Sequence, residues 1–279
     1  MPKRVLYAAT PEWTALANRI DELISSQGFH QIKVTPRTRA GFLLHEGRRA
    51  FVKRVDSGGY SKGLLARLLG SRARRALRGE RILAEGGFRH PQPLLIMEER
   101  SFGSVRASYI LTEALNDAQV LSAVAVGRRR PRKLRKEASE QVAREIRRLH
   151  DAGIYTRDMQ ETNLMIENRD SEFPLFFVDF EDFRRTQSVS IRQRMINLVH
   201  LDRSIGRFAP RQHRLRFFYN YFGYQLSREE RRALLKQYRT VRDQIERSAH
   251  RAKDSTRAIT AARRDSYDVA PNKVSGQQK

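Results

Sequence analysis

The pattern of hydrophobic and polar residues divides the chain into a first half of short β-like runs and a second half of helical runs. Near the start, Thr10-Pro11-Glu12 is typical of a helix N-terminus, and apolar residues follow at helical spacing until Gly28. Alternating runs then predict antiparallel strands at 29–35, 41–46, 48–55, 92–99 and 106–113.

Between these strands, residues from about 61 to 85 predict a helix with a basic face and a leucine-rich stripe. The second half predicts helices at 116–126, 132–151, about 188–207, 210–222 and 226–250. Beyond residue 250 the chain is polar and charged, and we expect it to be disordered or loosely attached.

This order of elements predicts an α+β fold with two lobes joined near the sequence LTEAL. We expect a β-rich amino lobe over 1–113, a mostly helical carboxyl lobe over 114–250 and a basic flexible tail over 251–279. A cleft between two lobes is a common ligand site.

Composition limits the class of protein. The absence of cysteine among the 279 residues excludes a disulfide scaffold and a cysteine-ligated zinc site, and it fits a reducing compartment. The N-terminal sequence MPKRVLYAATPEW lacks the apolar stretch of a signal peptide, and no window approaches the roughly 20 apolar residues of a membrane span. We therefore expect a soluble, cytosolic chain.

The net charge of +24, from 55 basic and 31 acidic residues, is the strongest compositional signal. Such an excess attracts polyanions, namely nucleic acid, anionic lipid or phosphorylated substrates, although a role in solubility alone also remains open. The sequence contains no nucleic-acid-binding motif, which disfavours nucleic acid as a partner.

Candidate chemistry is concentrated between residues 154 and 184. Asp158 lies in the loop YTRDMQETN, Asn163 ends that loop, and Asp179 follows the apolar run PLFFV after a polar turn. Two strands joined by that turn would form a hairpin that brings Asn163 and Asp179 together. An amide and a carboxylate oxygen suit Mg²⁺ with its phosphate ligands, and Asp158 could then position a hydroxyl. The alternative is that Asp158 and Asn163 only cap turns.

These residues resemble the catalytic core of the protein-kinase-like fold. TRDMQETN has the spacing of the H-R-D-x-x-x-x-N loop, and VDFED resembles the metal-binding D-F-G segment. The resemblance implies that Asp158 is the catalytic base and that Asn163 and Asp179 are Mg²⁺ ligands.

The resemblance extends to the nucleotide site. Lys53 in AFVKRV resembles the lysine that holds ATP phosphates, and Glu80 is its expected partner on the following helix, with Glu85 as the alternative. YILTEAL resembles the hinge between the lobes, where backbone groups from Glu113 to Leu115 would meet adenine.

Residues from about 40 to 225 are similar, in order, to the bacterial lipopolysaccharide core kinases, which phosphorylate Kdo or heptose. FVKRV, GGFRHPQPL and LHDAGIYTRDMQETNLMI carry this similarity. It implies ATP and Mg²⁺ as cofactors and a lipopolysaccharide core or lipid A precursor as acceptor. It also implies peripheral attachment to the anionic inner face of the bacterial cytoplasmic membrane.

Three departures separate the chain from protein kinases. Thr156 replaces the histidine of H-R-D, Glu181 replaces the glycine of D-F-G, and no G-x-G-x-x-G precedes Lys53. An activation segment and an A-P-E motif are also missing, which favours a glycan or small-molecule acceptor. A protein kinase, an aminoglycoside-type kinase and a non-catalytic nucleic-acid-binding module remain the alternatives.

Overall fold

The computed structural model describes residues 2–57, 70–126, 132–167, 172–223 and 225–268, with only the backbone given for 126, 132–135 and 252–268. Two compact units are present, residues 1–226 and residues 227–279. The first unit carries every candidate site residue.

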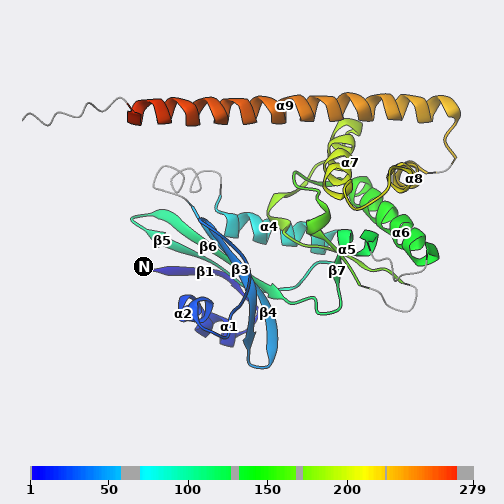
Figure 1. The fold of residues 1–279 in the computed structure, drawn as a ribbon. Helices are drawn as coiled ribbons and strands as arrows, with labels where there is room; N and C mark the ends of the chain where they lie inside the picture. The colour runs from blue at the N-terminus through cyan, green and yellow to red at the C-terminus, as the bar shows by residue number, and fades with distance from the viewer. Residues whose placement is uncertain (1, 58–69, 127–131, 168–171, 224, 269–279) are drawn as a thin grey trace, which may run out of the picture. The chain divides into compact units, whose positions relative to one another are not determined.

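A six-stranded antiparallel sheet forms the amino-terminal part of the first unit (Figure 1). Its spatial order is β1-β5-β6-β4-β3-β2. The strands are β1 (Lys3–Ala8), β2 (His30–Thr35), β3 (Thr38–His45), β4 (Arg48–Asp56), β5 (Pro93–Ser101) and β6 (Ser104–Glu113). The five strands predicted from alternation are confirmed, and β1, paired with β5, was not predicted.

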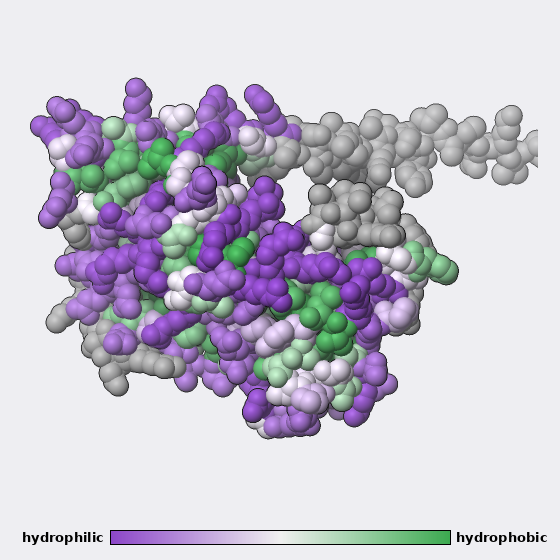
Figure 2. All heavy atoms as spheres, turned by 180° about the vertical axis from the view of Figure 1, so that it is seen from behind, coloured by the Kyte–Doolittle hydropathy of each residue, from purple (hydrophilic) through white to green (hydrophobic). Residues whose placement is uncertain are grey.

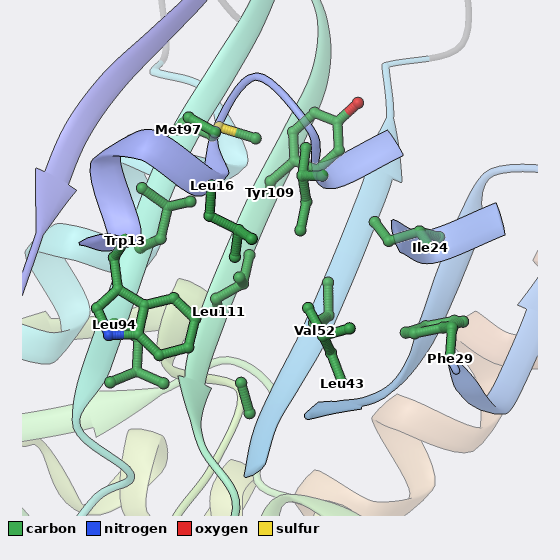
Figure 3. Close-up of a cluster of buried hydrophobic side chains, with 14 of the residues drawn as sticks. Trp13, Leu16, Ile24, Phe29, Leu43, Val52, Leu94, Met97, Tyr109 and Leu111 are labelled. Carbon is green, nitrogen blue, oxygen red and sulfur yellow. The ribbon is translucent and has the colours of Figure 1, made fainter. Parts of the chain in front are cut away.

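Two short helices, α1 (Pro11–Leu16) and α2 (Ile20–Ser25), cover one face of this sheet. Trp13 and Leu16 pack with buried strand residues such as Val52 and Leu111 in one hydrophobic core (Figure 3). The single helix predicted here is wrong, because backbone bonds from Ala17 to Thr14 and from Arg19 to Leu16 tighten the chain between the two pieces. The apolar stripe nevertheless stays buried across the break.

Helix α4 (Arg72–Glu85) begins at Ser71, whose side chain accepts a hydrogen bond from the backbone of Arg74. Ser71 also donates to the buried carboxylate of Glu98 on β5, and this contact ties the helix to the sheet. The earlier part of the predicted helix, with Leu64, Leu65, Leu68 and Leu69, lies outside the described residues.

The rest of the first unit is built from helices and very short strands. After the sheet come β7 (Gln119–Val120), α5 (Leu121–Val126) and α6 (Arg132–Asp151). They are followed by β8 (Ile154–Thr156), η1 (Glu161–Asn163), β9 (Leu164–Ile166), β10 (Leu175–Phe177), η2 (Phe180–Asp182), β11 (Phe183–Arg185), α7 (Ile191–Ile205) and α8 (Arg211–Phe222). The helices predicted at 132–151, 188–207 and 210–222 are confirmed to within three residues at each end.

Two antiparallel pairs frame the candidate loops. Strand β9 pairs with β10, which confirms the predicted hairpin, and β8 pairs with β11. Asp158 follows β8, Asn163 precedes β9, and Asp179 lies between β10 and β11. The two pairs therefore bring two loops, one with Asp158 and Asn163 and one with Asp179, to one region of the unit.

Gly79 allows α4 to pack closely against η2. A β-carbon at position 79 would collide with the backbone carbonyl oxygen of Phe180, whose own side chain is buried. This glycine thus sets how closely the helix approaches the segment that follows Asp179.

The second unit is the single long helix α9 (Arg228–Asp268). Of the two expectations for the tail, disorder is wrong for 251–268, whose backbone is helical, and loose attachment stays a prediction. The rest of the predicted tail, 269–279, lies outside the described residues. Residues with high helix propensity fill α9, and an Arg242–Glu246 pair at i,i+4 adds to its stability. Of the helices in the described ranges, none combines the length and the apolar character needed to cross a bilayer.

We predict that Gly79→Ala destabilises the first unit by about 2 kcal/mol, because overpacking against the Phe180 carbonyl outweighs the higher helix propensity of alanine. The melting temperature should fall by roughly 5 °C. Thermal unfolding followed by circular dichroism measures this shift. Gly28→Ala is the matched control, since the nearest atom to its added carbon would be Ser26 Oγ at 3.7 Å. A melting temperature that Gly79→Ala leaves unchanged would contradict the packing argument.

Candidate active site

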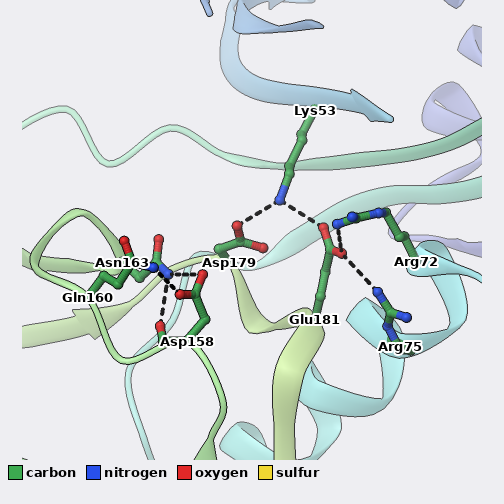
Figure 4. A network of polar contacts seen from close by, with 8 residues as sticks. All are labelled: Lys53, Arg72, Arg75, Asp158, Gln160, Asn163, Asp179 and Glu181. Atoms are coloured by element: carbon green, nitrogen blue, oxygen red, sulfur yellow. Dashed lines mark hydrogen bonds and ion pairs between the residues drawn. The ribbon is translucent and has the colours of Figure 1, made fainter. Parts of the chain in front are cut away.

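Lys53 is held between two carboxylates at the centre of the candidate site (Figure 4). It lies on β4 with its side chain on the sheet face opposite to the buried Val52. Its Nζ donates to Asp179 Oδ2 at 2.7 Å and to Glu181 Oε1 at 2.8 Å. Burial alone would lower the pKa of Lys53, but the negative charges of Asp179 and Glu181 outweigh burial and raise it. Lys53 is therefore a fixed cation that joins the sheet to the segment after β10.

Glu80 does not pair with Lys53, and this expected partnership is wrong. Glu80 Oε1 lies 3.4 Å from Nε2 of the buried His90, and the alternative, Glu85, pairs with Arg185 at 2.9 Å. Glu181, which lies on the segment after β10, makes the contact to Lys53 that was expected of an acid on α4.

Asp158 and Asn163 are joined across their loop. Asn163 Nδ2 donates to both the backbone oxygen and Oδ2 of Asp158, each at 3.0 Å, and the Gln160 amide donates to Asp158 Oδ1. The loop thereby holds the Asp158 carboxylate in one orientation. A carboxylate that accepts such bonds is placed to orient a hydroxyl group and to accept its proton.

Asp179 is presented by an unusual backbone conformation. Its φ of 57° and ψ of 59° lie in the left-handed region, which aspartate tolerates better than most residues. The backbone N–H of the preceding Val178 donates to the Asn163 carbonyl at 3.0 Å. This bond ties Asp179 to the end of the loop that carries Asp158, so the structure brings all three predicted side chains and Lys53 together.

The residues at this site fit a magnesium ion bound jointly with phosphate. Asp179 uses Oδ2 for Lys53 and Asn163 uses its amide nitrogen for Asp158, so each retains an oxygen for a hard cation. In the described part of the chain, no group of three or more His, Cys, Asp or Glu side chains could hold a metal by itself. Mg²⁺ usually takes one or two protein ligands together with phosphates and water. Two oxygen ligands, from Asp179 and Asn163, agree with this coordination.

A buried network supports the loop in place of the missing H-R-D histidine. His150 Nε2 and Nδ1 lie 3.0 Å from Asn197 Oδ1 and 2.6 Å from the hydroxyl of Tyr221. Asn197 in turn donates to the carbonyl of Thr156 at 2.7 Å, and the Thr156 hydroxyl accepts from the backbone of Asp158 at 3.2 Å. Helices α6, α7 and α8 therefore position Asp158 through hydrogen bonds that replace the absent histidine.

Of the predicted hinge residues, Glu113 is the last residue of β6 and Leu115 lies two residues beyond it. The N–H of Glu113 donates to Gln92 O, and that of Ala114 to Arg49 O. The Glu113 N–H is thus already used within the sheet, and the adenine contact stays a prediction.

Besides Glu181, residues Gln160, Arg72 and Arg75 belong to the site and were not predicted from the sequence. Gln160 orients Asp158, and Arg72 and Arg75 flank Glu181, with Arg72 Nη1 2.9 Å from Glu181 Oε2 and Arg75 Nη2 at 3.7 Å. One signal was available in the sequence, namely an acid, Glu181, at the position where the D-F-G pattern has glycine. A buried acid at this position needs a cationic partner. The two arginines lie more than one hundred positions earlier in the chain, and nothing local links them to Glu181.

The chain is similar to known proteins in sequence and in fold. The lipopolysaccharide kinase (Kdo/WaaP) family model matches residues 42–238. Two curated relatives, the 3-deoxy-D-manno-octulosonic acid kinases of Haemophilus influenzae strains PittGG and 86-028NP, are 29% and 28% identical over 116 residues. That match covers 39% of this chain, and the chain spans only 46% of the length of each relative.

A solved structure, "WaaP in complex with acyl carrier protein", superposes with a TM-score of 0.61 at 22% identity. The superposition covers 89% of this chain and 98% of that one. It confirms the predicted α+β kinase-like fold.

We predict that protonation of His150 destabilises the first unit in acid. Burial is the main cause that lowers the pKa of His150, from an ordinary 6.5 to about 4. Between these two pH values His150 binds a proton in the unfolded chain but not in the folded protein. The contribution of neutral His150 to the free energy of unfolding is therefore complete above pH 6.5 and is lost as the pH falls towards 4. The loss at pH 5 relative to pH 7.5 should be about 2 kcal/mol.

Urea unfolding at the two pH values, with His150→Gln as the comparison, isolates this contribution from that of other groups. The variant should lose about 2 kcal/mol less on acidification than the natural protein. An equal loss in both proteins would show that His150 is not kept neutral by the fold.

Proposed function

The chain belongs to the lipopolysaccharide kinase (Kdo/WaaP) family, and on this premise we propose that it transfers phosphate from ATP to a sugar hydroxyl of the lipopolysaccharide inner core, Kdo or heptose. The single observation that carries the proposal is the convergence of Lys53, Asp158, Asn163 and Asp179 in one site. This set supplies a cation for phosphates, oxygen ligands for Mg²⁺ and a carboxylate for the acceptor.

Each of the four side chains has a distinct part in the reaction. Lys53 binds the nucleotide phosphates, and Asn163 and Asp179 would hold Mg²⁺, which neutralises phosphate charge when bound. Asp158 orients the sugar hydroxyl and accepts its proton as the hydroxyl oxygen bonds to the γ-phosphorus. The bond from that phosphorus to the bridging oxygen breaks, and ADP leaves with the electron pair.

A glycan acceptor is favoured over a protein by the short chain after Asp179. Only η2, β11 and residues 186–190 separate Asp179 from α7. A protein kinase uses a longer activation segment in this interval to hold and regulate its substrate. The family membership points in the same direction.

We also propose that the protein works at the anionic inner face of the cytoplasmic membrane. The net charge is +24, and α4 exposes Arg78 and Arg81. Hydrophilic residues cover most of the described surface on the face drawn in Figure 2, and hydrophobic residues show only in separate patches. Each basic residue near an anionic leaflet contributes about 1 kcal/mol to membrane attraction.

We expect Asp158→Ala to lower kcat by about 10²–10⁴-fold, because the acceptor hydroxyl loses its base, while nucleotide affinity changes little. Transfer from radiolabelled ATP to lipid A–core, isolated from cells that lack the protein, measures the rate. Calorimetry with a non-hydrolysable ATP analogue measures affinity. Asp56→Ala, which removes an acid whose described ion pair is with Arg54 of the same strand, is the control. A natural rate in Asp158→Ala would refute the assignment.

Asp179→Asn should raise the Mg²⁺ concentration needed for half-maximal transfer by about tenfold or more, since a charged metal ligand becomes neutral. A magnesium titration at saturating ATP measures this shift. The Asp56→Ala protein again provides the comparison, and an unchanged magnesium requirement would remove Asp179 from the metal site.

Mass spectrometry identifies the acceptor. Lipid A–core from cells without the protein should lack one phosphate on Kdo or heptose. Labelled protein with unchanged lipid would instead indicate a protein kinase.

A further inference from the structure

Glu181 is a buried acid surrounded by three cations. Its side chain is only 3% exposed. Glu181 lies two residues after Asp179, the candidate metal ligand. Oε1 accepts from Lys53 at 2.8 Å, and Oε2 accepts from Arg72 at 2.9 Å, with Arg75 at 3.7 Å. The sequence pattern would place glycine here, so the acid requires an explanation.

We propose that Glu181 is the positioning residue for Lys53 during phosphate transfer. In this arrangement the acid that orients the phosphate-binding lysine comes from the fourth position of V-D-F-E-D and not from α4. Helix α4 supplies cations in place of the acid. The inference rests on the proposed kinase function and concerns how the Lys53 side chain is held in position for phosphate.

The backbone around Glu181 is suited to such a role because it is closely packed. Phe180, immediately before it, is buried, and its carbonyl oxygen lies against Gly79 of α4. Phe183, two residues after it, is also buried. An acid on this segment has little freedom to move away from Lys53.

The hydrogen-bonding capacity of Lys53 allows it to keep Glu181 while it binds phosphate. An ammonium group has three donors, and Lys53 uses two of them, for Asp179 and Glu181. The third donor can reach a phosphate oxygen without loss of the bond to Glu181. Three cations against two carboxylates also leave this group with one net positive charge, which favours a triphosphate.

Arg72 and Arg75 offset part of the free-energy cost of burying the charged Glu181 carboxylate. A buried carboxylate with one partner would retain a large desolvation cost, and three partners offset it. Lys53 contacts one oxygen of Glu181 and Arg72 contacts the other. Substitution of Arg72 therefore removes this contact to α4 and leaves the contact to Lys53 in place.

The experiment compares Glu181→Gln, Arg72→Gln and the matched control Glu85→Gln in the full-length protein. Glu85 is an acid of α4 paired at the surface with Arg185. Transfer to lipid A–core and the affinity for the ATP analogue with Mg²⁺ are measured for each, and circular dichroism gives the melting temperature.

We expect Glu181→Gln to lower kcat by about tenfold or more, because the bond from Lys53 to a charged carboxylate becomes a weaker bond to a neutral amide oxygen. The KM for ATP should stay within about threefold, because removal of a negative charge does not repel phosphate. Arg72→Gln should cause a clearly smaller loss of kcat, and Glu85→Gln should match the natural protein. This split between kcat and KM would not arise from a role in folding alone.

Three outcomes overturn the inference. An unchanged kcat in Glu181→Gln would show that Lys53 needs no such partner. An equal loss in Arg72→Gln would show that Glu181 only tethers α4, and a kcat loss fully explained by a lower melting temperature would show a structural role. If the natural protein binds no nucleotide, the proposed function fails and this inference fails with it.

Discussion

The pair of ion contacts from Lys53 to Asp179 and Glu181 is the interaction on which the rest of the site depends. It joins β4, in the sheet of the first half of the chain, to the turn that follows β10. Partly buried ion pairs contribute little net stability, because desolvation offsets much of their attraction. Their main effect here is geometric, since they bring a phosphate-binding cation to a candidate metal ligand. The close packing of Gly79 on Phe180 stabilises the same arrangement.

Two substitutions in the kinase-like pattern are compensated elsewhere in the first unit. The H-R-D histidine is replaced by Thr156, and the loop is held instead by Asn197 and His150 from two helices. The acid for Lys53 is missing from α4, and Glu181 provides it. In both cases residues from other parts of the chain make a contact where the kinase-like pattern lacks its usual residue.

The strong positive charge has two separable parts. Some arginines, such as Arg72 and Arg75, contact the buried Glu181 and neutralise its charge. Others, such as Arg78 and Arg81, face solvent and are available to an anionic acceptor or membrane. A charged surface raises the local concentration of an anionic substrate and does not by itself choose its hydroxyl. That choice belongs to the groups around Asp158.

The sequence by itself determined the class of fold, the positions of most strands and helices, and the three oxygen-bearing residues of the site. Alternation and helical spacing are local signals, and Asp158, Asn163 and Asp179 lie within one short stretch that forms a hairpin. Tertiary structure decided which acid Lys53 contacts and how Thr156 is supported. The structure also showed where the first helix breaks, and it extended the last helix past residue 250. The first two depend on contacts between residues far apart in the chain, whose distances no local pattern contains. The break in the first helix comes instead from local backbone bonds, from Ala17 to Thr14 and from Arg19 to Leu16. The length of α9 was misjudged for another reason, because a polar and charged composition fits a long solvated helix as well as a disordered tail.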